Sequence, residues 1–222
     1  MLLALDTSTA QVGLALHDGT QVAGELFWHS QQHHTVELAP AIADLLARIG
    51  KNMDDIQVLG VALGPGSFTS LRVGLALIKG LALARHLPVV GIPTLDVVAA
   101  AVPPSERRLA AVLHAGRGRL ALGWYIPSEE GWQAQGPAVV TTAEELVEKI
   151  RKPTIVCGEM TSEERQRLAR RFKKVILASP AQCVRRPALL AELAWKRWQS
   201  GRVDAAATLA PIYLHVAGGP PA

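Results

Sequence analysis

The chain alternates short apolar runs with stretches of helical periodicity, and this alternation occurs twice along its 222 residues. A strand-rich opening followed by alternating helices and strands is typical of an α/β protein, so we expect two lobes with mixed sheets and flanking helices. The first series predicts strands at 2–5, 12–16 and 22–27, a helix at 36–49, a strand at 58–63, a helix at 70–86, a strand at 89–92 and a helix near 95–101. The second series predicts strands at 109–115 and 120–126, a helix from 142 to about 150, a strand at 154–157, a helix at 162–171, a strand at 175–177 and a helix at 187–201.

Charge is distributed unevenly between the two series. Residues 1–101 carry a net charge of −3 and residues 102–222 a net charge of +7. The change coincides with the linker-like segment Val102-Pro103-Pro104-Ser105, so we predict lobes at 1–102 and 103–222, with the option that the last helix packs back onto the first lobe. The basic second half could face RNA or another polyanion. A solvated basic surface accounts for the same pattern.

Composition favours a well-packed globular protein, since hydrophobic residues make up 49% of the chain and charged residues only 19%. Every apolar stretch is interrupted before it reaches the roughly 18 residues that a membrane span needs, so no membrane association is predicted. The first five residues lack the basic start of a signal peptide. The two cysteines, Cys157 and Cys183, make neither a disulfide framework nor a metal motif. We therefore expect a cytoplasmic protein.

The turn Asp6-Thr7-Ser8-Thr9, between the first two strands, is the first candidate site. Its hydroxyls and backbone N–H groups could hold phosphate oxygens, and Asp6 could position a metal ion or a water molecule. Asp, Thr and Ser are also ordinary turn residues, and on that interpretation the turn has no ligand.

A glycine-rich loop, Gly64-Pro65-Gly66-Ser67, leads from the strand at 58–63 into the helix at 70–86. A helix N-terminus after such a loop can bind an anion, but the Gly-Lys-Ser/Thr sequence of a P-loop is missing. A structural role, in which the loop places the helix tightly against the sheet, explains the glycines equally well.

The helix at 70–86 is the most informative element. Arg72, Lys79 and His86 form its polar stripe, and nearly all other positions are apolar or small. A helix packed on one sheet needs an apolar face of only about 100°, so this helix should be covered on two sides. The second cover is either the neighbouring helix at 36–49 alone or that helix together with another protein. A strip of small residues that would let another backbone approach closely is formed by Ala76, Gly80 and Ala84.

The histidines are weaker candidates for a site. His29 and His33 have the spacing of metal ligands on a helix, and His34 adjoins them. They fall in a predicted polar loop without a third ligand, so we interpret them as surface residues. No Ser/His/Asp order, CxxC or HExxH pattern is present, and neither catalytic chemistry nor a metal site is predicted.

Several segments of the chain, in this order, resemble the bacterial TsaB (YeaZ) family, and together they span nearly its whole length. The resemblance implies a degenerate member of the ATPase superfamily with an actin/Hsp70/hexokinase-like fold. The segments are Leu3-Ala4-Leu5-Asp6-Thr7-Ser8-Thr9, the block 64–74 with its Gly-Pro-Gly-Ser-Phe-Thr sequence, Lys79-Gly80-Leu81-Ala82, Pro88-Val89-Val90-Gly91-Ile92 and Pro211-Ile212-Tyr213-Leu214.

The resemblance also implies a function as the partner of the catalytic subunit TsaD. Together with the ATPase TsaE, that complex transfers a threonylcarbamoyl group to N6 of the adenosine 3′ of the anticodon in tRNAs that read ANN codons. The helices at 36–49 and 70–86 would pack against the equivalent pair of TsaD, or against a second copy of this chain, and tRNA would be bound only within the complex. The implied contact residues are Leu38, Ile42, Leu45, Leu71, Arg72, Leu75, Ala76, Lys79, Gly80, Leu83 and Ala84.

A contrast with the TsaD family implies that this chain lacks catalysis of its own. The metal pair of TsaD would fall at Thr94 and Val98, which cannot bind a metal. Its glycine-rich adenosine loop has no counterpart, because Gly218-Gly219 lies in a Pro-rich tail with no helix after it. We therefore expect no catalytic residue, no metal and no tightly bound cofactor, with at most weak ATP or ADP binding at the partner interface. The turn at 6–9 would be a remnant of a phosphate loop. Departures from the family pattern occur at Ser70, His114 and His215.

Two hypotheses of different class follow. The leading one is a non-catalytic assembly subunit that holds TsaD in a competent conformation. The alternative is an active ATP-dependent kinase or ATPase that uses Asp6, Thr7 and Ser8, and it predicts micromolar ATP binding by the isolated chain. A peptidase is unsupported, because no nucleophile–base pair is present.

Overall fold

Two structural units make up the chain in a computed structural model, which describes residues 1–31, 34–171 and 173–214. Unit 1 comprises Met1–Val97 and Arg186–Ile212, and unit 2 comprises Val98–Arg185 and the residues from Tyr213 on. The first unit thus ends at Val97 rather than at the predicted residue 102. Residues 186–212 belong to unit 1 and not to the second lobe, because the last helix packs onto the first sheet, the option noted above.

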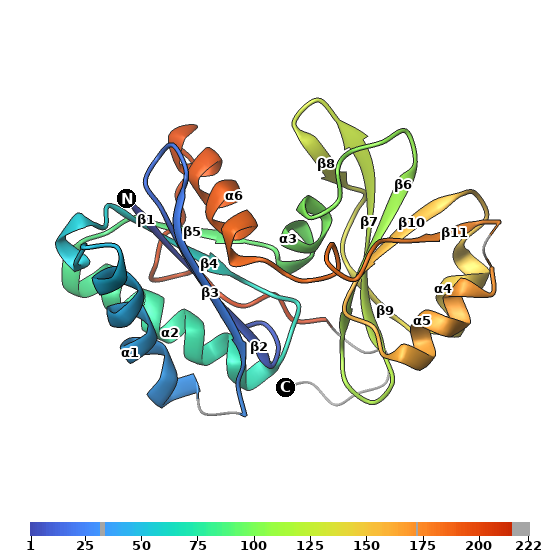
Figure 1. The fold of residues 1–222 in the computed structure, drawn as a ribbon, viewed down its shortest axis with the longest axis horizontal. Helices are drawn as coiled ribbons and strands as arrows, with labels where there is room; N and C mark the ends of the chain where they lie inside the picture. The colour runs from blue at the N-terminus through green and yellow to red at the C-terminus, as the bar shows by residue number, and fades with distance from the viewer. Residues whose placement is uncertain (32–33, 172, 215–222) are drawn as a thin grey trace. The chain divides into compact units, whose positions relative to one another are not determined.

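Unit 1 is built on a five-stranded mixed sheet in the order β3-β2-β1-β4-β5 (Figure 1). The hairpin strands pair antiparallel, whereas β1 pairs parallel with β4 and β4 with β5. Asp18-Gly19 closes the predicted hairpin, with Gly19 at a positive φ of 105°. The strands are β1 (Leu2–Asp6), β2 (Gln11–His17), β3 (Val22–His29), β4 (Val58–Ala62) and β5 (Val89–Ile92).

Helices cover both faces of this sheet. Along β1 the side chains alternate: Leu3 and Leu5 join the core beneath α1 and α2, while Leu2 and Ala4 join the core beneath α6. Figure 1 shows α1 and α2 on one side of the sheet and α6 on the other. The elements are α1 (His34–Arg48), the short 3-10 helix η1 (Met53–Asp55), α2 (Phe68–Arg85), α3 (Thr94–Ala100) and α6 (Pro187–Gln199).

Unit 2 repeats the same plan. Its sheet has the order β11-β10-β6-β7-β8, and β9 also pairs with β7. When β6 is matched to β1, the order β8-β7-β6-β10-β11 is the same as β3-β2-β1-β4-β5 in unit 1. In both sheets the first strand has antiparallel hairpin strands on one side and two parallel strands on the other. The elements are β6 (Arg108–His114), β7 (Leu120–Ser128), β8 (Gly131–Ala134), β9 (Val139–Thr141), α4 (Ala143–Lys149), β10 (Thr154–Gly158), α5 (Ser162–Ala169) and β11 (Val175–Leu177).

The helices of unit 2 start at side-chain caps. The hydroxyl of Thr142 accepts a hydrogen bond from the backbone N–H of Glu145, and Thr161 forms a capping box with Glu164. Both helices pack through Leu146 and Leu168 on the same core, which contains Val112 of β6. The alternation predicted twice from sequence therefore corresponds to two copies of one architecture.

Some local predictions were wrong. The polar loop predicted at 28–34 is largely regular structure, because β3 continues to His29 and α1 begins at His34. Pro40 lies in the second turn of α1, on its exposed side. Strands β8 and β9 were not predicted. No helix within the described residues is both long and apolar enough to cross a bilayer.

Candidate functional site

The turn at 6–9 follows β1, at the edge of the sheet where the parallel strands β1, β4 and β5 end. Ligands of open α/β sheets commonly bind at this edge. Here the side chains form hydrogen bonds within the chain itself. The Thr7 hydroxyl donates to the carbonyl oxygen of Ser70 at 2.8 Å, and the Ser8 hydroxyl lies 2.7 Å from that of Thr94. Asp6 Oδ1 accepts from the backbone N–H of Ser8 at 2.8 Å.

Three of the four residues predicted as a phosphate-loop remnant are thus buried and bonded internally. Asp6, Thr7 and Ser8 are at most 2% exposed. Thr9 is partly exposed, and its hydroxyl accepts from the backbone N–H of Gln11 at 3.2 Å. A phosphate at this turn would have to displace these hydrogen bonds, so the geometry favours a structural role for the turn.

The glycine loop packs directly on this turn. Ser67 donates its backbone N–H to the carbonyl oxygen of Ser8 at 2.7 Å, and Gly64 donates to the hydroxyl of Thr94 at 2.9 Å. A Cβ atom on Gly66 would lie 2.1 Å from the Ser8 carbonyl oxygen, which no side chain could tolerate. The Gly64–Pro65 peptide bond is cis, and Ser67 caps the N-terminus of α2.

The loop therefore fixes where α2 begins. Gly74, in the second turn of the helix, continues the close approach, since a Cβ there would lie 2.1 Å from the hydroxyl oxygen of Thr7. The N-terminal half of α2 is held against the sheet by backbone contacts that larger residues would prevent.

Five of the predicted contact residues cannot meet a partner, because they form the core of unit 1. Each is at most 6% exposed. They face the sheet side of α1 and α2, where helical periodicity brings apolar positions together. Their assignment as a partner surface is corrected: these residues are Leu38, Ile42, Leu45, Leu71 and Leu75.

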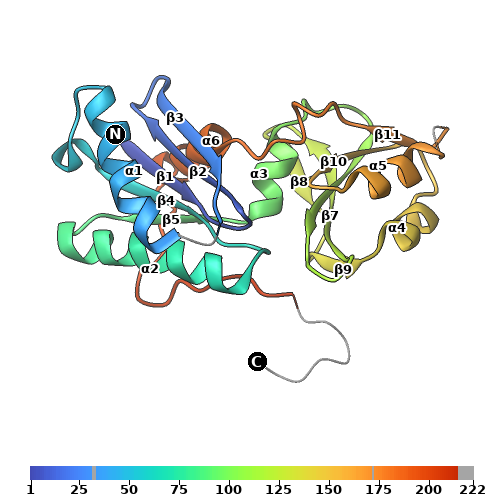
Figure 2. The ribbon, with the colours of Figure 1, turned by 60° about the horizontal axis from the view of Figure 1, so that its bottom comes forward.

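The chain itself also supplies part of the second cover of α2. Ala206 and Leu209, from the segment after α6, pack against the core beneath the helix. Lys79 is partly buried and donates to the carbonyl oxygen of Ala207 at 3.3 Å, so this predicted contact residue is held by its own chain. Figure 2 shows this segment running beside α2. The surplus apolar surface is thus smaller than the sequence indicated.

Within the part of the chain that the structure describes, a strip of α2 at four-residue spacing and the outward face of α1 remain uncovered. The α2 part contains the other predicted contact residues, Arg72, Ala76, Gly80, Leu83 and Ala84, and Leu83 is 78% exposed. We call this the helix-pair surface. It consists of Phe68, Arg72, Ala76, Gly80, Leu83 and Ala84 from α2 and Val36, Ala39, Pro40, Ala43 and Ala47 from α1.

The prediction missed Phe68 and all the α1 members of this surface. Phe68 is 45% exposed, and Val36 is among the exposed large hydrophobic residues. The four-residue series of 76, 80 and 84 extends back through 72 to 68, and this spacing could have pointed to Phe68. The exposed alanines of α1 alternate with its buried leucines. Helical periodicity could therefore have identified these alanines as surface positions from the sequence.

The helix-pair surface consists mainly of small and apolar residues, with Arg72 as its charged member. Apart from its chain neighbours and the backbone of its own helix, a Cβ atom built on Gly80 would meet no atom of the described residues within 4 Å, so no packing contact there requires a glycine. Small residues in a row let a second helix approach closely, whereas Phe68 and Leu83 project as larger contacts. The arrangement is suited to packing another pair of helices.

Other candidate positions form no metal site. His29 is exposed, His34 is buried with its Nδ1 3.3 Å from the Ser30 hydroxyl, and His33 lies outside the described residues. Thr94 is buried and engaged by Ser8 and Gly64. Among residues 1–31, 34–171 and 173–214, no three His, Cys, Asp or Glu side chains come together as metal ligands would.

The positions that depart from the family pattern are only partly described. His114 is exposed at the end of β6, and Ser70 lies in the first turn of α2, where its carbonyl oxygen binds the Thr7 hydroxyl. His215 and the Gly218-Gly219 pair lie outside the described residues.

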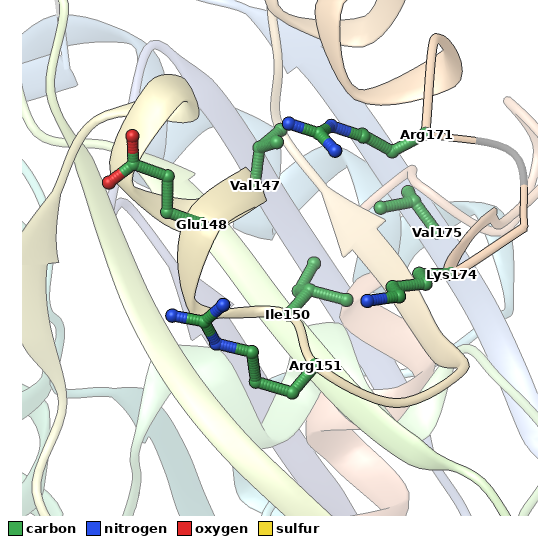
Figure 3. Close-up of a pocket in the computed structure, with 7 residues that line it drawn as sticks. All are labelled: Val147, Glu148, Ile150, Arg151, Arg171, Lys174 and Val175. Carbon is green, nitrogen blue, oxygen red and sulfur yellow. The ribbon is translucent and has the colours of Figure 1, made fainter.

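A basic pocket of about 290 Å³ lies in unit 2 between the ends of α4 and α5. Figure 3 shows the side chains of Arg151, Arg171 and Lys174 around the apolar side chain of Ile150. Such a pocket attracts anions, but Glu148 is its one acidic lining residue and offers no acid–base pair for catalysis. Both sequence interpretations of the basic half, a surface facing RNA and a solvated surface, remain compatible with it.

Comparisons with known proteins find matches to the model of the TsaD family and to individual TsaB proteins. The model of the family described as TsaD, tRNA N6-adenosine threonylcarbamoyltransferase, matches residues 28–193. The tRNA threonylcarbamoyladenosine biosynthesis protein TsaB of Escherichia coli is 32% identical over 155 residues, which cover 68% of this chain and 66% of that protein. TsaB of Bacillus subtilis is 30% identical over 221 residues, covering 97% of this chain and 94% of that protein.

Solved structures show the same relationship at the level of the fold. YeaZ from Pseudomonas aeruginosa superposes with a TM-score of 0.79 at 25% identity, covering 96% of this chain and 99% of that one. The ethanolamine utilization protein EutJ from Carboxydothermus hydrogenoformans, at 14% identity, shares the fold alone, with a TM-score of 0.52 and coverage of 86% and 89%. The predicted actin/Hsp70/hexokinase-like fold is confirmed, and the chain belongs to the TsaB (YeaZ) family.

Proposed function

We propose that this chain is the non-catalytic assembly subunit of the tRNA threonylcarbamoyltransferase machinery. In this role it binds TsaD through the helix-pair surface and keeps TsaD competent to transfer threonylcarbamoyl to the adenosine 3′ of the anticodon in ANN-decoding tRNAs. TsaE joins the same machinery, and tRNA is bound only by the complex. The family membership supports the pathway, and the exposed strip from Phe68 to Ala84 is the observation that supports the binding mode.

The composition of the strip supports a protein partner rather than solvent. Ala76, Gly80 and Ala84 are exposed on a helix whose opposite face is already buried on its own sheet. A helix that only faces water normally carries charged residues at such positions. A partner related to this fold offers a helix pair of similar shape, and a second copy of this chain offers the same surface.

The state of the turn at 6–9 supports a role without catalysis. The hydroxyls of Thr7 and Ser8 and the carboxylate of Asp6 are engaged by Ser70, Thr94 and the turn's own backbone. In an active kinase or ATPase, groups at this position must be free to meet phosphate oxygens or a metal ion. We therefore propose that the isolated chain binds no nucleotide tightly and that any weak ATP or ADP site forms with the partner.

The binding mode can be tested with two charged variants of the strip, Ala76→Glu and Gly80→Arg. Neither side chain would clash within the chain: Ala76 is exposed, and the Cβ position of Gly80 is open. A charge buried in an apolar helix interface without a partner costs several kcal/mol, so both variants should fail to co-elute with TsaD in size-exclusion chromatography.

The matched control is Ala169→Glu, the same change at an exposed alanine on α5 of unit 2. It should co-elute with TsaD like the wild type. All three variants should unfold at temperatures close to that of the wild type. Unchanged co-elution of Ala76→Glu and Gly80→Arg would overturn the proposed binding mode.

A further inference from the structure

The two cysteines of the chain lie beside each other in unit 2, although they are far apart in sequence. Cys157 is fully buried in β10, and Cys183 is partly exposed in the turn that follows β11. The Sγ atom of Cys157 lies 3.1 Å from the carbonyl oxygen of Gln182, the residue before Cys183. Cys183 follows Gln182 directly in the same turn, so the fold places the two cysteines next to each other.

The turn that carries Cys183 is anchored next to the strand that carries Cys157. The backbone N–H of Ala178 donates to the carbonyl oxygen of Val156 at 3.0 Å, which continues the β10–β11 pairing up to the turn. The backbone N–H of Cys183 then donates to the carbonyl oxygen of Ser179 at 3.1 Å. These bonds hold the turn that carries Cys183 beside β10.

Arg165 of α5 places a positive charge on the exposed side of the pair. Its Nη1 atom lies 3.7 Å from Cys183 Sγ, and its Nη2 atom donates to the carbonyl oxygen of Ala178 at 2.6 Å. The second bond fixes the guanidinium beside the sulfur. The titratable and charged groups that face Cys183 are thus Arg165 from α5 and Cys157 from β10, and the backbone of Gly158 adds a hydrogen bond.

These groups shift the pKa values of the two thiols in opposite directions. The hydrogen bond from Cys157, together with that from Gly158 and the charge of Arg165, lowers the pKa of Cys183 to about 6, although partial burial acts in the opposite direction. The hydrogen bond to Cys183 and burial raise the pKa of Cys157, which keeps its proton. One sulfur is a partly exposed thiolate at neutral pH, and the other is a protonated thiol behind it.

We propose that Cys183 and Cys157 form a redox-active pair, in which a peroxide oxidises Cys183 and Cys157 then closes an intramolecular disulfide. In the first step the Cys183 thiolate attacks one oxygen of hydrogen peroxide. The S–O bond forms, the O–O bond breaks, and hydroxide leaves with a proton as water, so that sulfur is oxidised to a sulfenic acid. In the second step the Cys157 sulfur attacks the Cys183 sulfur and loses its proton. The S–S bond forms, and the S–O bond breaks with release of a second water.

The advantage of Cys183 over an ordinary thiol should be largest at mildly acidic pH. At pH 6 about half of its thiol is ionised, against roughly 0.3% for a thiol with a pKa near 8.5. The lower nucleophilicity of the weaker base offsets this gain roughly tenfold, so a net advantage of about tenfold remains at pH 6. At pH 8 an ordinary thiol should react as fast.

The product would tie the turn at 180–183 covalently to β10. Cys183 lies shortly before Arg186, where the chain passes from unit 2 into unit 1. Oxidation would therefore restrain the last segment of unit 2 before this connection, without requiring β10 to leave its sheet.

The experiment treats the full chain with hydrogen peroxide between pH 5 and 8.5 and follows thiol loss by mass spectrometry after alkylation. The wild type should lose both thiols together and yield one disulfide-linked peptide pair within a single chain. Cys157→Ser should stop at a sulfenic acid on Cys183 that dimedone traps, whereas Cys183→Ser should leave Cys157 unmodified. The rate should fall as pH drops through about 6, because protonation removes the thiolate.

Arg165→Gln tests the role of the guanidinium, and its matched control is Arg167→Gln on the same helix, where the side chain forms surface ion pairs with Glu144 and Glu163. Arg165→Gln should move the midpoint of the pH profile upward and slow the reaction several-fold at pH 6, and Arg167→Gln should change neither. The pH profile of the wild type does not depend on whether the variants fold. A disulfide between two chains, oxidation of Cys157 before Cys183, or a rate at pH 6 no higher than that of an ordinary thiol would overturn the proposal.

Discussion

The guanidinium of Arg72 lies over the ring of Phe68, with 3.6 Å between Cζ and the ring centroid. The two residues are one turn apart at the start of α2, and both belong to the helix-pair surface. Stacking fixes a large aromatic ring and a planar cation in one orientation before any partner arrives. Aromatic residues and arginine dominate the binding energy of many interfaces, and ordering them in advance lowers the entropic cost of association.

We therefore expect Phe68→Ala to weaken the complex with TsaD by about 2 kcal/mol, or roughly 30-fold in Kd, without lowering the stability of the free chain. Phe27→Ala is the matched control, because Phe27 on β3 is 46% exposed against 45% for Phe68 and lies outside the helix-pair surface. Titration calorimetry of both variants measures the difference. Equal affinities for TsaD would show that Phe68 is not part of the contact.

Two glycines of the same region should respond oppositely to alanine. Gly66→Ala should destabilise the chain by about 3 kcal/mol or more, because the new Cβ would lie 2.1 Å from the Ser8 carbonyl oxygen. Gly80→Ala should raise the free energy of unfolding by about 0.5–1 kcal/mol, since its Cβ position is open and alanine favours the helix. Urea unfolding monitored by circular dichroism compares them. A Gly66→Ala protein as stable as the wild type would mean that the loop does not pack on the turn.

The ion pair between Arg185 and Glu159 in unit 2 should be important for stability, because the Arg185 side chain is 1% exposed and that of Glu159 is 17% exposed. Arg185→Met leaves the Glu159 carboxylate without this partner and should cost about 3–5 kcal/mol. Arg85→Met, at the exposed ion pair with Asp54, should change stability by about 1 kcal/mol at most. Thermal unfolding measures the loss of stability in each variant. Similar losses in both would contradict the importance of the Arg185–Glu159 ion pair.

The proposal that the isolated chain binds no nucleotide tightly can be tested directly. Micromolar binding would stabilise the protein by about 2.7 kcal/mol at an ATP concentration 100 times Kd, which is a shift in Tm of several degrees. We expect millimolar ATP with magnesium to leave the Tm unchanged. A clear upward shift that is lost in Asp6→Asn would favour the active kinase or ATPase instead.

Elements with a strong local pattern could be predicted from sequence, and those that depend on distant neighbours could not. The helix around Leu45 follows from periodicity, the helix after Thr142 from its capping residues, and the Asp18-Gly19 turn from its residue types. The strand at Val139–Thr141 is three residues long and is defined by its pairing with β7, so it has no pattern of its own. The proximity of Cys157 to the turn that carries Cys183 depends on the β10–β11 pairing and could not be predicted from sequence either.

The candidate surface was only half predictable for a related reason. A helix that is apolar on nearly all sides carries little information about which side faces its own sheet, so Leu71 and Leu75 were assigned to a partner although they are buried. The small-residue spacing of Ala76 and Gly80 did identify the outward strip, because it depends on size and not on hydrophobicity alone. The segment that contains Leu209 covers part of α2, although it comes from the far end of unit 1 in sequence. Only the fold reveals this cover.

The central claim is that the chain acts by binding the related protein TsaD through the helix-pair surface. The amount of threonylcarbamoyladenosine in tRNA tests this claim most directly. The source organism would be depleted of this protein and supplied with the wild type, Gly80→Arg or Ala169→Glu at equal levels, and digested tRNA would be measured by mass spectrometry. We predict that threonylcarbamoyladenosine is lost on depletion, restored by the wild type and Ala169→Glu, and absent with Gly80→Arg. Full modification after depletion, or full restoration by Gly80→Arg, would contradict the account.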